Sequence, residues 1–371
     1  MNVAHGGRRR IIRRTGLAGS LGLAGMALSG CSLTDINNPV LRAGWPEGIT
    51  PQATRMQHLW TWSIVAAMVM GLLVWGLVFW TILFHRKRAN SPEFPRQTGY
   101  NVPLELAYTA FPFVAVAILF FFTVQTQNYV DKNPDDVGVV VDVTAKKWNW
   151  TFGYREAAEF NYGGANDPES NEQGQRGANL EVSEEVKEMT IKGQAKAGMD
   201  MSYLFEDDIE TTGSTTEIPV LVLPVDTSVS FTLASVDVIH SFWVPQFLFK
   251  RDVMPYPAAN QSRNTFTISE IERTGAFVGR CAEMCGTYHS MMNFEIRAIP
   301  KPMFARYLEI RDVSRNGGDI VSNAQALAQL QTEFTEECGE ELCSPTSTTT
   351  RPFEAKYLQQ ANSVAGLTTG N

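Results

Sequence analysis

The segment CAEMCGTYHSMM, residues 281–292, collects side chains that commonly bind metals. Cys281 and Cys285 are separated by three residues, His289 follows Cys285 at the same spacing, and Met292 closes the segment. Two thiols this close could simply form a small disulfide. Thiolate, imidazole and thioether donors within one short segment favour a metal instead, and soft donors of this kind suit copper.

Histidines are scarce elsewhere in the chain, which narrows the search for a further ligand. Of five histidines, His5 lies near the N-terminus, and His58 and His85 flank a long apolar run. Only His240 and His289 remain for the rest of the protein. A single histidine is more often structural than a ligand, but His240 ends a strand-like segment, SVDVIH, and is the candidate to complete the site in a compact domain.

The donor set separates the possible metal sites. A structural zinc site usually has four Cys or His ligands at C-x-x-C spacing, and methionine is a poor zinc ligand. Mononuclear blue copper uses one cysteine, two histidines and a weak axial methionine, so this chain has one cysteine too many. Two thiolates could instead bridge two copper ions, each with one histidine and one weak ligand. Such a centre suits electron transfer and leaves no open position for substrate chemistry.

Two apolar runs predict a membrane hairpin. Residues 59–84 and 106–124 contain no charged side chain, and each run could cross a hydrocarbon core of about 30 Å as a helix. We therefore predict helices over about 59–84 and 106–126. The basic residues 85–88 between them place this loop in the cytoplasm. Everything after residue 130 then lies outside the plasma membrane.

The N-terminus has the pattern of an export signal. Residues 1–30 combine a basic region, a short apolar region and a small-residue site before Cys31. The ending LSGC resembles a lipobox, which predicts cleavage after residue 30 and lipidation of Cys31; an ordinary cleavage site that contains a cysteine is the alternative. Removal of residues 1–30 takes away five arginines and leaves 26 basic against 39 acidic residues, a formal charge of −13. Nucleic acid is thereby disfavoured, and a cationic protein partner is favoured.

Residues 131–305 have the pattern of an all-β domain. Apolar and polar residues alternate over 137–154, and strand signals resume near 218 and continue to 299. Short strands with turn signals at this spacing predict an antiparallel sandwich or barrel. The ligand segment then lies between the last two strands. Residues 156–216, rich in Gly, Asn, Glu and Gln, are predicted to be a solvated insertion.

The C-terminal region, residues 306–371, is polar and helical in pattern. Its segment STTTRPF, which begins at Ser347, is expected to be mobile. Cys338 and Cys343 lie close together in EECGEELC and are predicted to form a local disulfide outside the membrane. Free thiols and a second metal site are the alternatives, although no histidine lies near them.

Taken together, the motif C-x-E-x-C-x-x-x-H-x-x-M and the upstream D-V-x-H-S-x-x-V-P resemble subunit II of the heme-copper cytochrome c oxidases. The resemblance covers nearly the whole chain after the signal. Three features resemble the actinobacterial form of this subunit. They are the lipobox, the acidic insertion and the sequence RCAEMCGTYH. The resemblance implies a two-helix transmembrane hairpin followed by an all-β cupredoxin-like sandwich or barrel with a C-terminal helical extension.

The resemblance also implies a binuclear copper centre, CuA. Cys281 and Cys285 would bridge the two metals, and His240 and His289 would each bind one. Met292 would be an axial ligand. Glu283 would offer its backbone carbonyl to copper, while its carboxylate would bind a magnesium ion shared with subunit I.

Three further residues match family positions outside the copper ligands. Trp148 matches the tryptophan of electron input from cytochrome c, with a buried core aromatic as the alternative. Glu105 matches the glutamate at the mouth of a proton path into subunit I, and Asp237 matches an acidic residue near the docking face. A solvated charge is the alternative for both acids.

The implied function is the electron-input subunit of cytochrome c oxidase. It would accept electrons from cytochrome c and pass them to heme in subunit I, where oxygen is reduced to water and protons are pumped. The implied partners are subunits I and III, membrane lipid, and cytochrome c or a membrane-tethered diheme cytochrome c of the bc complex. We hypothesise that the insertion 156–216 contacts that complex.

Other functions fit the residues less well. The alternative is a membrane-anchored copper-binding or delivery lipoprotein, against which the full ligand set argues. A nitrous oxide reductase shares the motif but needs more histidines than this chain has. A quinol oxidase subunit lacks these copper ligands.

Overall fold

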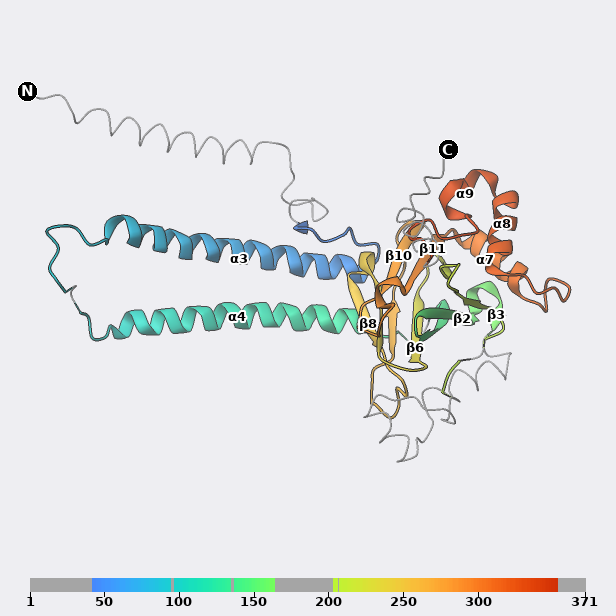
Figure 1. Ribbon diagram of the computed structural model, residues 1–371, viewed down its shortest axis with the longest axis horizontal. Coiled ribbons are helices and arrows are strands. Elements are labelled where there is room, and N and C mark those ends of the chain that lie inside the picture. Colours follow the sequence, from blue (N-terminus) through green and yellow to red (C-terminus); the bar gives the residue numbers. More distant parts are fainter. Residues whose placement is uncertain (1–41, 95–96, 135–136, 164–202, 206, 353–371) are drawn as a thin grey trace, which may run out of the picture. The chain divides into compact units, whose positions relative to one another are not determined.

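The computed structural model describes residues 42–94, 97–134, 137–163, 203–205 and 207–352 (Figure 1). The predicted signal, Cys31 and much of the predicted insertion lie outside these residues. The described residues form two long helices, a β-sandwich and a set of C-terminal helices.

The two helices, α3 (Pro51–Phe84) and α4 (Val102–Val130), are each long and apolar enough to cross a membrane. Helix α3 begins ahead of its apolar run. Thr50 accepts a hydrogen bond from the backbone N–H of Ala53 at 3.1 Å, which caps the helix, and a proline in the first position suits a helix start. The polar first turns are therefore continuous with the apolar part of the helix.

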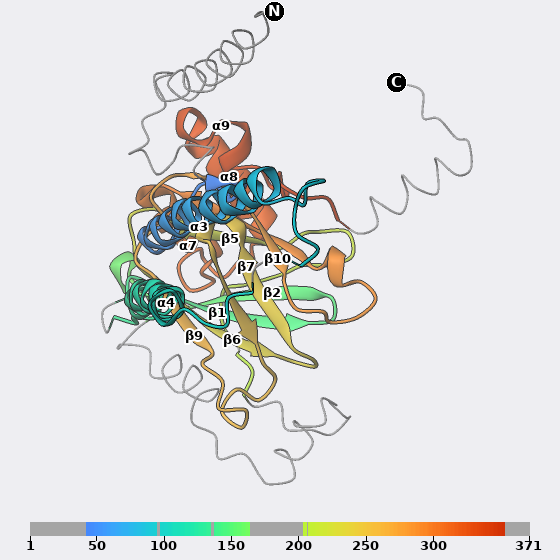
Figure 2. The same cartoon turned by 90° about the vertical axis from the view of Figure 1, so that its left-hand side faces the viewer.

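Eleven strands in the described residues form two sheets, as predicted for an all-β domain. The first sheet has the order β3-β2-β1-β6-β9, with β4 beside β2, and the second has the order β5-β11-β10-β7-β8. Figure 2 shows the two layers. Pairs β1–β6 and β5–β11 are parallel, and the other pairs are antiparallel. The strands are β1 (Val139–Lys146), β2 (Asn149–Ala157), β3 (Tyr162–Gly163), β4 (Glu210–Thr212), β5 (Val220–Pro224), β6 (Val229–Ser235), β7 (His240–Val244), β8 (Phe249–Val253), β9 (Thr265–Ile268), β10 (Gly275–Cys281) and β11 (Asn293–Ile299).

Alternating side chains from both sheets fill the space between them. On β1, Val139, Val141 and Val143 are fully buried, as expected for every second residue of a strand. Phe294 on β11 packs against Phe242 on β7, with ring centroids 4.7 Å apart. The ligand segment connects β10 to β11, as predicted, and is therefore held at both ends by paired strands.

The described part of the C-terminal extension contains three helices, α7 (Lys301–Arg311), α8 (Asn323–Glu333) and α9 (Thr335–Leu342), which lie on one side of the sandwich (Figure 1). A capping box between Ser322 and Gln325 starts α8. Cys338 and Cys343 are joined by a disulfide, with their Cα atoms 5.2 Å apart. The extension contributes to the core, since Phe304 and Leu327 are fully buried.

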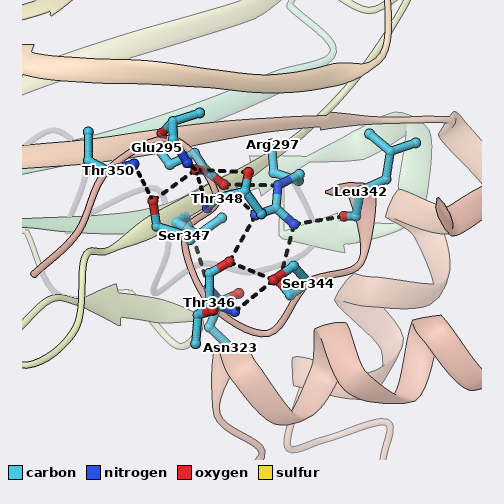
Figure 3. Close-up of polar contacts among 11 residues, drawn as sticks. Glu295, Arg297, Asn323, Leu342, Ser344, Thr346, Ser347, Thr348 and Thr350 are labelled. Atoms are coloured by element: carbon cyan, nitrogen blue, oxygen red, sulfur yellow. Dashed lines mark hydrogen bonds and ion pairs between the residues drawn. The ribbon is translucent and has the colours of Figure 1, made fainter. Parts of the chain in front are cut away.

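Beyond α9, residues 342–350 form a segment that we call the C-terminal strap. It covers a buried ion pair on β11, Glu295 and Arg297, whose side chains have no exposed surface. Because these residues are two apart on a strand, both side chains leave the same face. Figure 3 shows the strap wrapped around this pair.

The strap supplies polar partners to both charges. The Arg297 guanidinium donates to the backbone carbonyls of Leu342 (3.0 Å), Ser344 (3.1 Å) and Thr346 (3.3 Å). Glu295 Oε2 accepts hydrogen bonds from Ser347 Oγ and from the backbone N–H groups of Thr348 and Thr349, each at 2.8 Å. The expectation that the segment beginning at Ser347 is mobile is therefore wrong for residues 347–349, because a distant strand provides their partners.

Candidate metal centre

Backbone pairing brings the predicted ligands together from two parts of the chain. Strand β7 begins at His240 and pairs with the end of β10, where Cys281 lies opposite Phe242. The N–H of Cys281 donates to the carbonyl of Met292 at 3.0 Å, which closes the ligand segment into a loop. His240 is thus positioned by a neighbouring strand, and the remaining donors by one loop.

The donor atoms converge around the two cysteines. Cys281 Sγ lies 3.8 Å from His240 Nδ1 and 3.3 Å from the carbonyl oxygen of Glu283. Cys285 Sγ lies 3.6 Å from His289 Nδ1 and 3.9 Å from Met292 Sδ. The two sulfurs are 3.9 Å apart. Each cysteine therefore has one imidazole and one weaker donor beside it.

These distances fit shared metal coordination. Metal–thiolate bonds of about 2.3 Å allow two sulfurs on one metal to lie up to about 4.6 Å apart, and a thiolate and an imidazole up to about 4.3 Å. The sulfur–sulfur distance of 3.9 Å lies within the first limit, and both sulfur–nitrogen distances lie within the second. Both thiols are free and buried, so the donor set fits soft metal ions such as copper.

Burial and neighbouring groups give the two thiols different proton affinities. Burial raises the pKa of Cys281, but the neighbouring His240 imidazole and backbone groups outweigh it and lower the pKa to about 7. Burial and the adjacent charge of Cys281 raise the pKa of Cys285 to about 12. Without a cation, the pair therefore holds one negative charge more readily than two. A metal that binds both thiolates must displace the second proton.

Comparison with known proteins identifies the family. The profile described as "Cytochrome C oxidase subunit II, periplasmic domain" matches residues 196–299. A "Probable cytochrome c oxidase subunit 2" from Nocardia farcinica is 55% identical over 357 residues, which cover 94% of this chain and 90% of the relative. Cytochrome c oxidase subunit 2 from Mycobacterium tuberculosis is 44% identical over 371 residues, covering 97% and 94%. The chain belongs to the cytochrome c oxidase subunit 2 family.

One solved structure is similar to this chain over part of its length. The periplasmic domain of subunit II of cytochrome oxidase from Bradyrhizobium japonicum covers 47% of this chain and 93% of its own length, with 22% sequence identity and a TM-score of 0.27. Cytochrome c oxidase subunit 2 from Corynebacterium glutamicum is 46% identical over 93% of this chain and 94% of its own length. As a subunit 2, the chain is part of an oxidase complex.

In this subunit 2 chain, Trp148 lies against the ligand loop. It lies in the turn between β1 and β2, and its ring meets that of Tyr288 edge-on, with centroids 4.7 Å apart. A Cβ atom added at Gly286 would lie 3.3 Å from the Trp148 indole. Gly286, at φ +126°, therefore permits the close approach of the indole to the loop that holds Cys285 and His289.

Sequence reasoning missed the role of Trp150, the second tryptophan of KWNWTFGY. Its side chain is fully buried, and its Nε1 donates to the carbonyl of Met292 at 3.3 Å. Its ring also lies beside His240, with centroids 6.3 Å apart. Strand alternation would place Trp148 and Trp150, two residues apart, on the same face, so the sequence could not show that Trp148 lies in the turn and only Trp150 is in the strand.

Asp237 lies beside His240, a predicted ligand, and its side chain is only 23% exposed. Its Oδ1 is 2.8 Å from His240 Nε2, on the ring edge opposite the Nδ1 that faces Cys281. Burial lowers the pKa of His240, but the hydrogen bond with Asp237 outweighs it and raises the pKa. Burial raises the pKa of Asp237, but the bonds from His240 and two backbone N–H groups outweigh it and lower the pKa.

Glu105 lies in the first turn of α4, where it has a local structural task. Its carboxylate accepts a hydrogen bond from the backbone N–H of Asn101 at 2.9 Å. Asn101 in turn accepts from the N–H of Leu104 at 3.3 Å. These reciprocal bonds cap the start of the helix and are compatible with a further role for the carboxylate.

Proposed function

We propose that this chain is the electron-input subunit of a cytochrome c oxidase, with a binuclear CuA centre at the ligand loop. The observation that carries the proposal is the convergence of two free cysteines, each flanked by one imidazole and one weaker donor. The subunit accepts electrons from cytochrome c and passes them toward heme in subunit I, where oxygen is reduced to water and protons are pumped.

Six residues would hold the centre. Cys281 and Cys285 would be shared by the metals, His240 and His289 would each bind one, and Met292 and the Glu283 carbonyl would be weak ligands. When bound, the copper pair supplies a one-electron redox couple shared between two metals. The chain keeps water away from it, because His240 and Met292 are almost completely buried. The strands β7, β10 and β11 fix the donors in advance, which limits rearrangement during electron transfer.

Glu283 would have two separate tasks. Its backbone carbonyl faces Cys281, while its side chain is exposed. This division supports the assignment of the carbonyl to copper and of the carboxylate to a magnesium ion shared with subunit I, since carboxylate oxygens suit magnesium.

The electron donor would approach at Trp148. A hollow of about 420 Å³ beside this residue is lined by Lys147, Tyr288 and neighbouring residues. Met284 nearby on the ligand loop is 73% exposed. An apolar surface next to a tryptophan that touches the loop supports short-lived docking of cytochrome c or of a membrane-tethered diheme cytochrome c. Subunits I and III would complete the complex.

The two apolar helices and the periplasmic-type domain support anchoring in the plasma membrane with the sandwich on the outside. Lipidation of Cys31 after signal cleavage would add a second anchor. Glu105 at the start of α4 would lie at the mouth of the proton path into subunit I.

Copper analysis with an EPR spectrum on the purified full-length subunit in its oxidase complex tests this proposal. We expect two coppers in the subunit and a spectrum of one electron shared between them. A single exchangeable copper would contradict the proposal and favour the alternative, a membrane-anchored copper-delivery lipoprotein. Absence of copper at this loop would also overturn it.

Replacement of Trp148 by leucine tests electron input separately from copper binding. We expect Trp148→Leu to keep both coppers and to slow electron input from the donor, with Trp148→Phe less affected because an aromatic ring remains. Rapid-mixing measurements of donor oxidation, with the EPR spectrum as the control, give both quantities. Unchanged kinetics in the leucine variant would leave Trp148 as a packing residue.

A further inference from the structure

Asp237 connects two parts of the proposed electron path that are far apart in the sequence. One oxygen of its carboxylate, Oδ1, lies 2.8 Å from His240 Nε2. The other, Oδ2, accepts a hydrogen bond from the backbone N–H of Lys147 at 2.8 Å. Lys147 immediately precedes Trp148. The same side chain therefore contacts a metal-ligand ring and the turn that carries the proposed electron-input indole.

The contact with His240 determines which ring nitrogen carries the proton. A neutral imidazole has one N–H donor and one nitrogen with a free lone pair, and an ionised carboxylate can only accept. Because Nε2 faces Asp237, we assign the proton to Nε2. The lone pair is then on Nδ1, which faces Cys281 Sγ at 3.8 Å. This is the tautomer that a metal ion at the cluster requires.

The backbone holds Asp237 itself in place. Its Oδ1 also accepts from the N–H of Val238 at 2.7 Å, and its own N–H donates to Ser235 Oγ at 3.2 Å. The Ser235 hydroxyl donates in turn to the carbonyl of Val238. These hydrogen bonds hold the Asp237 carboxylate in place independently of its contact with His240. A side chain held in this way can orient its partner.

The two histidines of the site differ in this respect. Within the described part of the chain, the His289 ring has its polar contact with Cys285 Sγ, at 3.6 Å, and no carboxylate partner. Its exposed neighbours place it near the surface, whereas His240 is fully buried. The supporting carboxylate is thus specific to the buried ligand.

We infer that Asp237 is a positioning residue that fixes the tautomer and orientation of His240 and joins this ligand to the Trp148 turn. The inference rests on the proposed CuA function and adds a residue that is not itself a ligand. This role differs from that of a docking charge, which the family resemblance implies for this position. Both carboxylate oxygens of Asp237 accept hydrogen bonds from groups of the same chain.

Two replacements of Asp237 separate positioning from docking. Asp237→Ala removes every acceptor. Asp237→Asn removes the charge but keeps one oxygen, which can serve His240 and Val238 together, since both donors meet at Oδ1. Asp252→Ala is the matched control, because Asp252 is an exposed acid on β8 opposite Ser241 and its loss removes a nearby charge without touching His240.

The measurements are made on the full oxidase complex. They are the rate of copper loss to a chelator, the copper hyperfine pattern in EPR, and the donor KM over a range of ionic strengths. We expect copper affinity to fall about 10- to 100-fold in Asp237→Ala, as is usual when a partner of a metal ligand is removed, with an altered hyperfine pattern. In Asp237→Asn, the rate of copper loss and the hyperfine pattern should stay close to those of the wild type. In Asp252→Ala, both should be unchanged.

Three outcomes would overturn the inference. Unchanged copper retention and hyperfine pattern in Asp237→Ala would exclude positioning. Equal increases of the donor KM in Asp237→Ala and Asp237→Asn, without a change at copper, would make Asp237 a docking charge. Equal loss of copper in both variants would show that charge, and not orientation, matters. A wild-type complex without the CuA spectrum would instead refute the proposed function.

Discussion

The ligand cluster and the Glu295–Arg297 pair are neighbours on the chain, yet they are completed in different ways. Met292, the last ligand, lies three residues before Glu295. The chain itself completes the ion pair, because the C-terminal strap gives hydrogen bonds to both charges. At the ligand cluster, two buried sulfurs instead face each other at 3.9 Å with imidazoles beside them.

The difference separates a structural polar site from a functional one. A buried charge that has all its partners stabilises one arrangement of the chain. Burial raises the pKa of Glu295, but Arg297 and the strap donors outweigh it and lower the pKa, so the pair is ionised and satisfied. The cysteines carry opposed pKa shifts and need a cation to hold both as thiolates. Incomplete pairing at preformed donors therefore marks the place where a ligand belongs.

The largest expected effect comes from removal of a cluster thiol. Cys281→Ser should abolish the two-copper EPR spectrum and cytochrome c oxidation, because serine is a hard donor and cannot replace a bridging thiolate. The subunit should still insert into the membrane. The matched control replaces Cys338 and Cys343 by serine, which removes the disulfide but should leave copper bound. Full activity in Cys281→Ser would contradict the functional assignment of the cluster. The cluster would then be a structural site, like the Glu295–Arg297 pair.

The next effect concerns the ion pair. Arg297→Met leaves Glu295 buried without its counter-charge, which should cost about 3–5 kcal/mol of stability. Loss of the copper absorption in guanidinium chloride measures this cost. The control is Arg306→Met, which breaks a partly exposed pair with Glu333 at 2.7 Å and should cost about 1 kcal/mol or less. Similar losses in the two variants would show that the strap does not isolate the buried pair from water.

A half-buried carboxylate, Asp207, extends the comparison and gives the smallest expected effect. Burial, followed by the charge of Asp142, raises its pKa to about 8, and its Oδ2 is buried without a hydrogen-bond partner in the described residues. A raised carboxyl pKa means that the folded state favours the protonated form. This preference stabilises the fold at low pH and is lost as the pH rises from about 4 through 8.

Asp207→Asn imitates the protonated form at every pH. We expect it to stabilise the domain at pH 8 by about 1 kcal/mol or less, because the half-buried side chain is partly screened by solvent, and to give no gain near pH 4. Melting temperatures at both pH values, with the exposed neighbour Asp208→Asn as the control, check this. The same difference at both pH values would exclude a titrating carboxyl.

Local patterns allowed much of the site to be predicted from the sequence. Five of the six proposed donor residues lie in one short segment, so their spacing alone indicates a metal. The apolar runs predict the long helices, and alternation predicts the sandwich. The start of α3 could not be read from hydropathy, because its first turns are polar and are set by the Thr50 cap.

Contacts between distant segments could not be predicted in this way. The strap reaches Glu295 across 52 to 54 residues, and nothing in STTTRPF indicates a buried partner. Asp237 meets Lys147 across 90 residues. Trp150 supports Met292 from a strand 142 residues earlier. Each of these contacts depends on the strand order, which the sequence pattern leaves open.

The strap also sets an order of events during biosynthesis. Chains are synthesised from their N-terminal end, so the loop of residues 281–292 is complete before residues 342–350 are added. Until these last residues arrive, the charges of Glu295 and Arg297 lie open to water on the strand that follows Met292. The sheet that carries the loop therefore gains its full set of polar contacts only after residues 342–350 have been added to the chain.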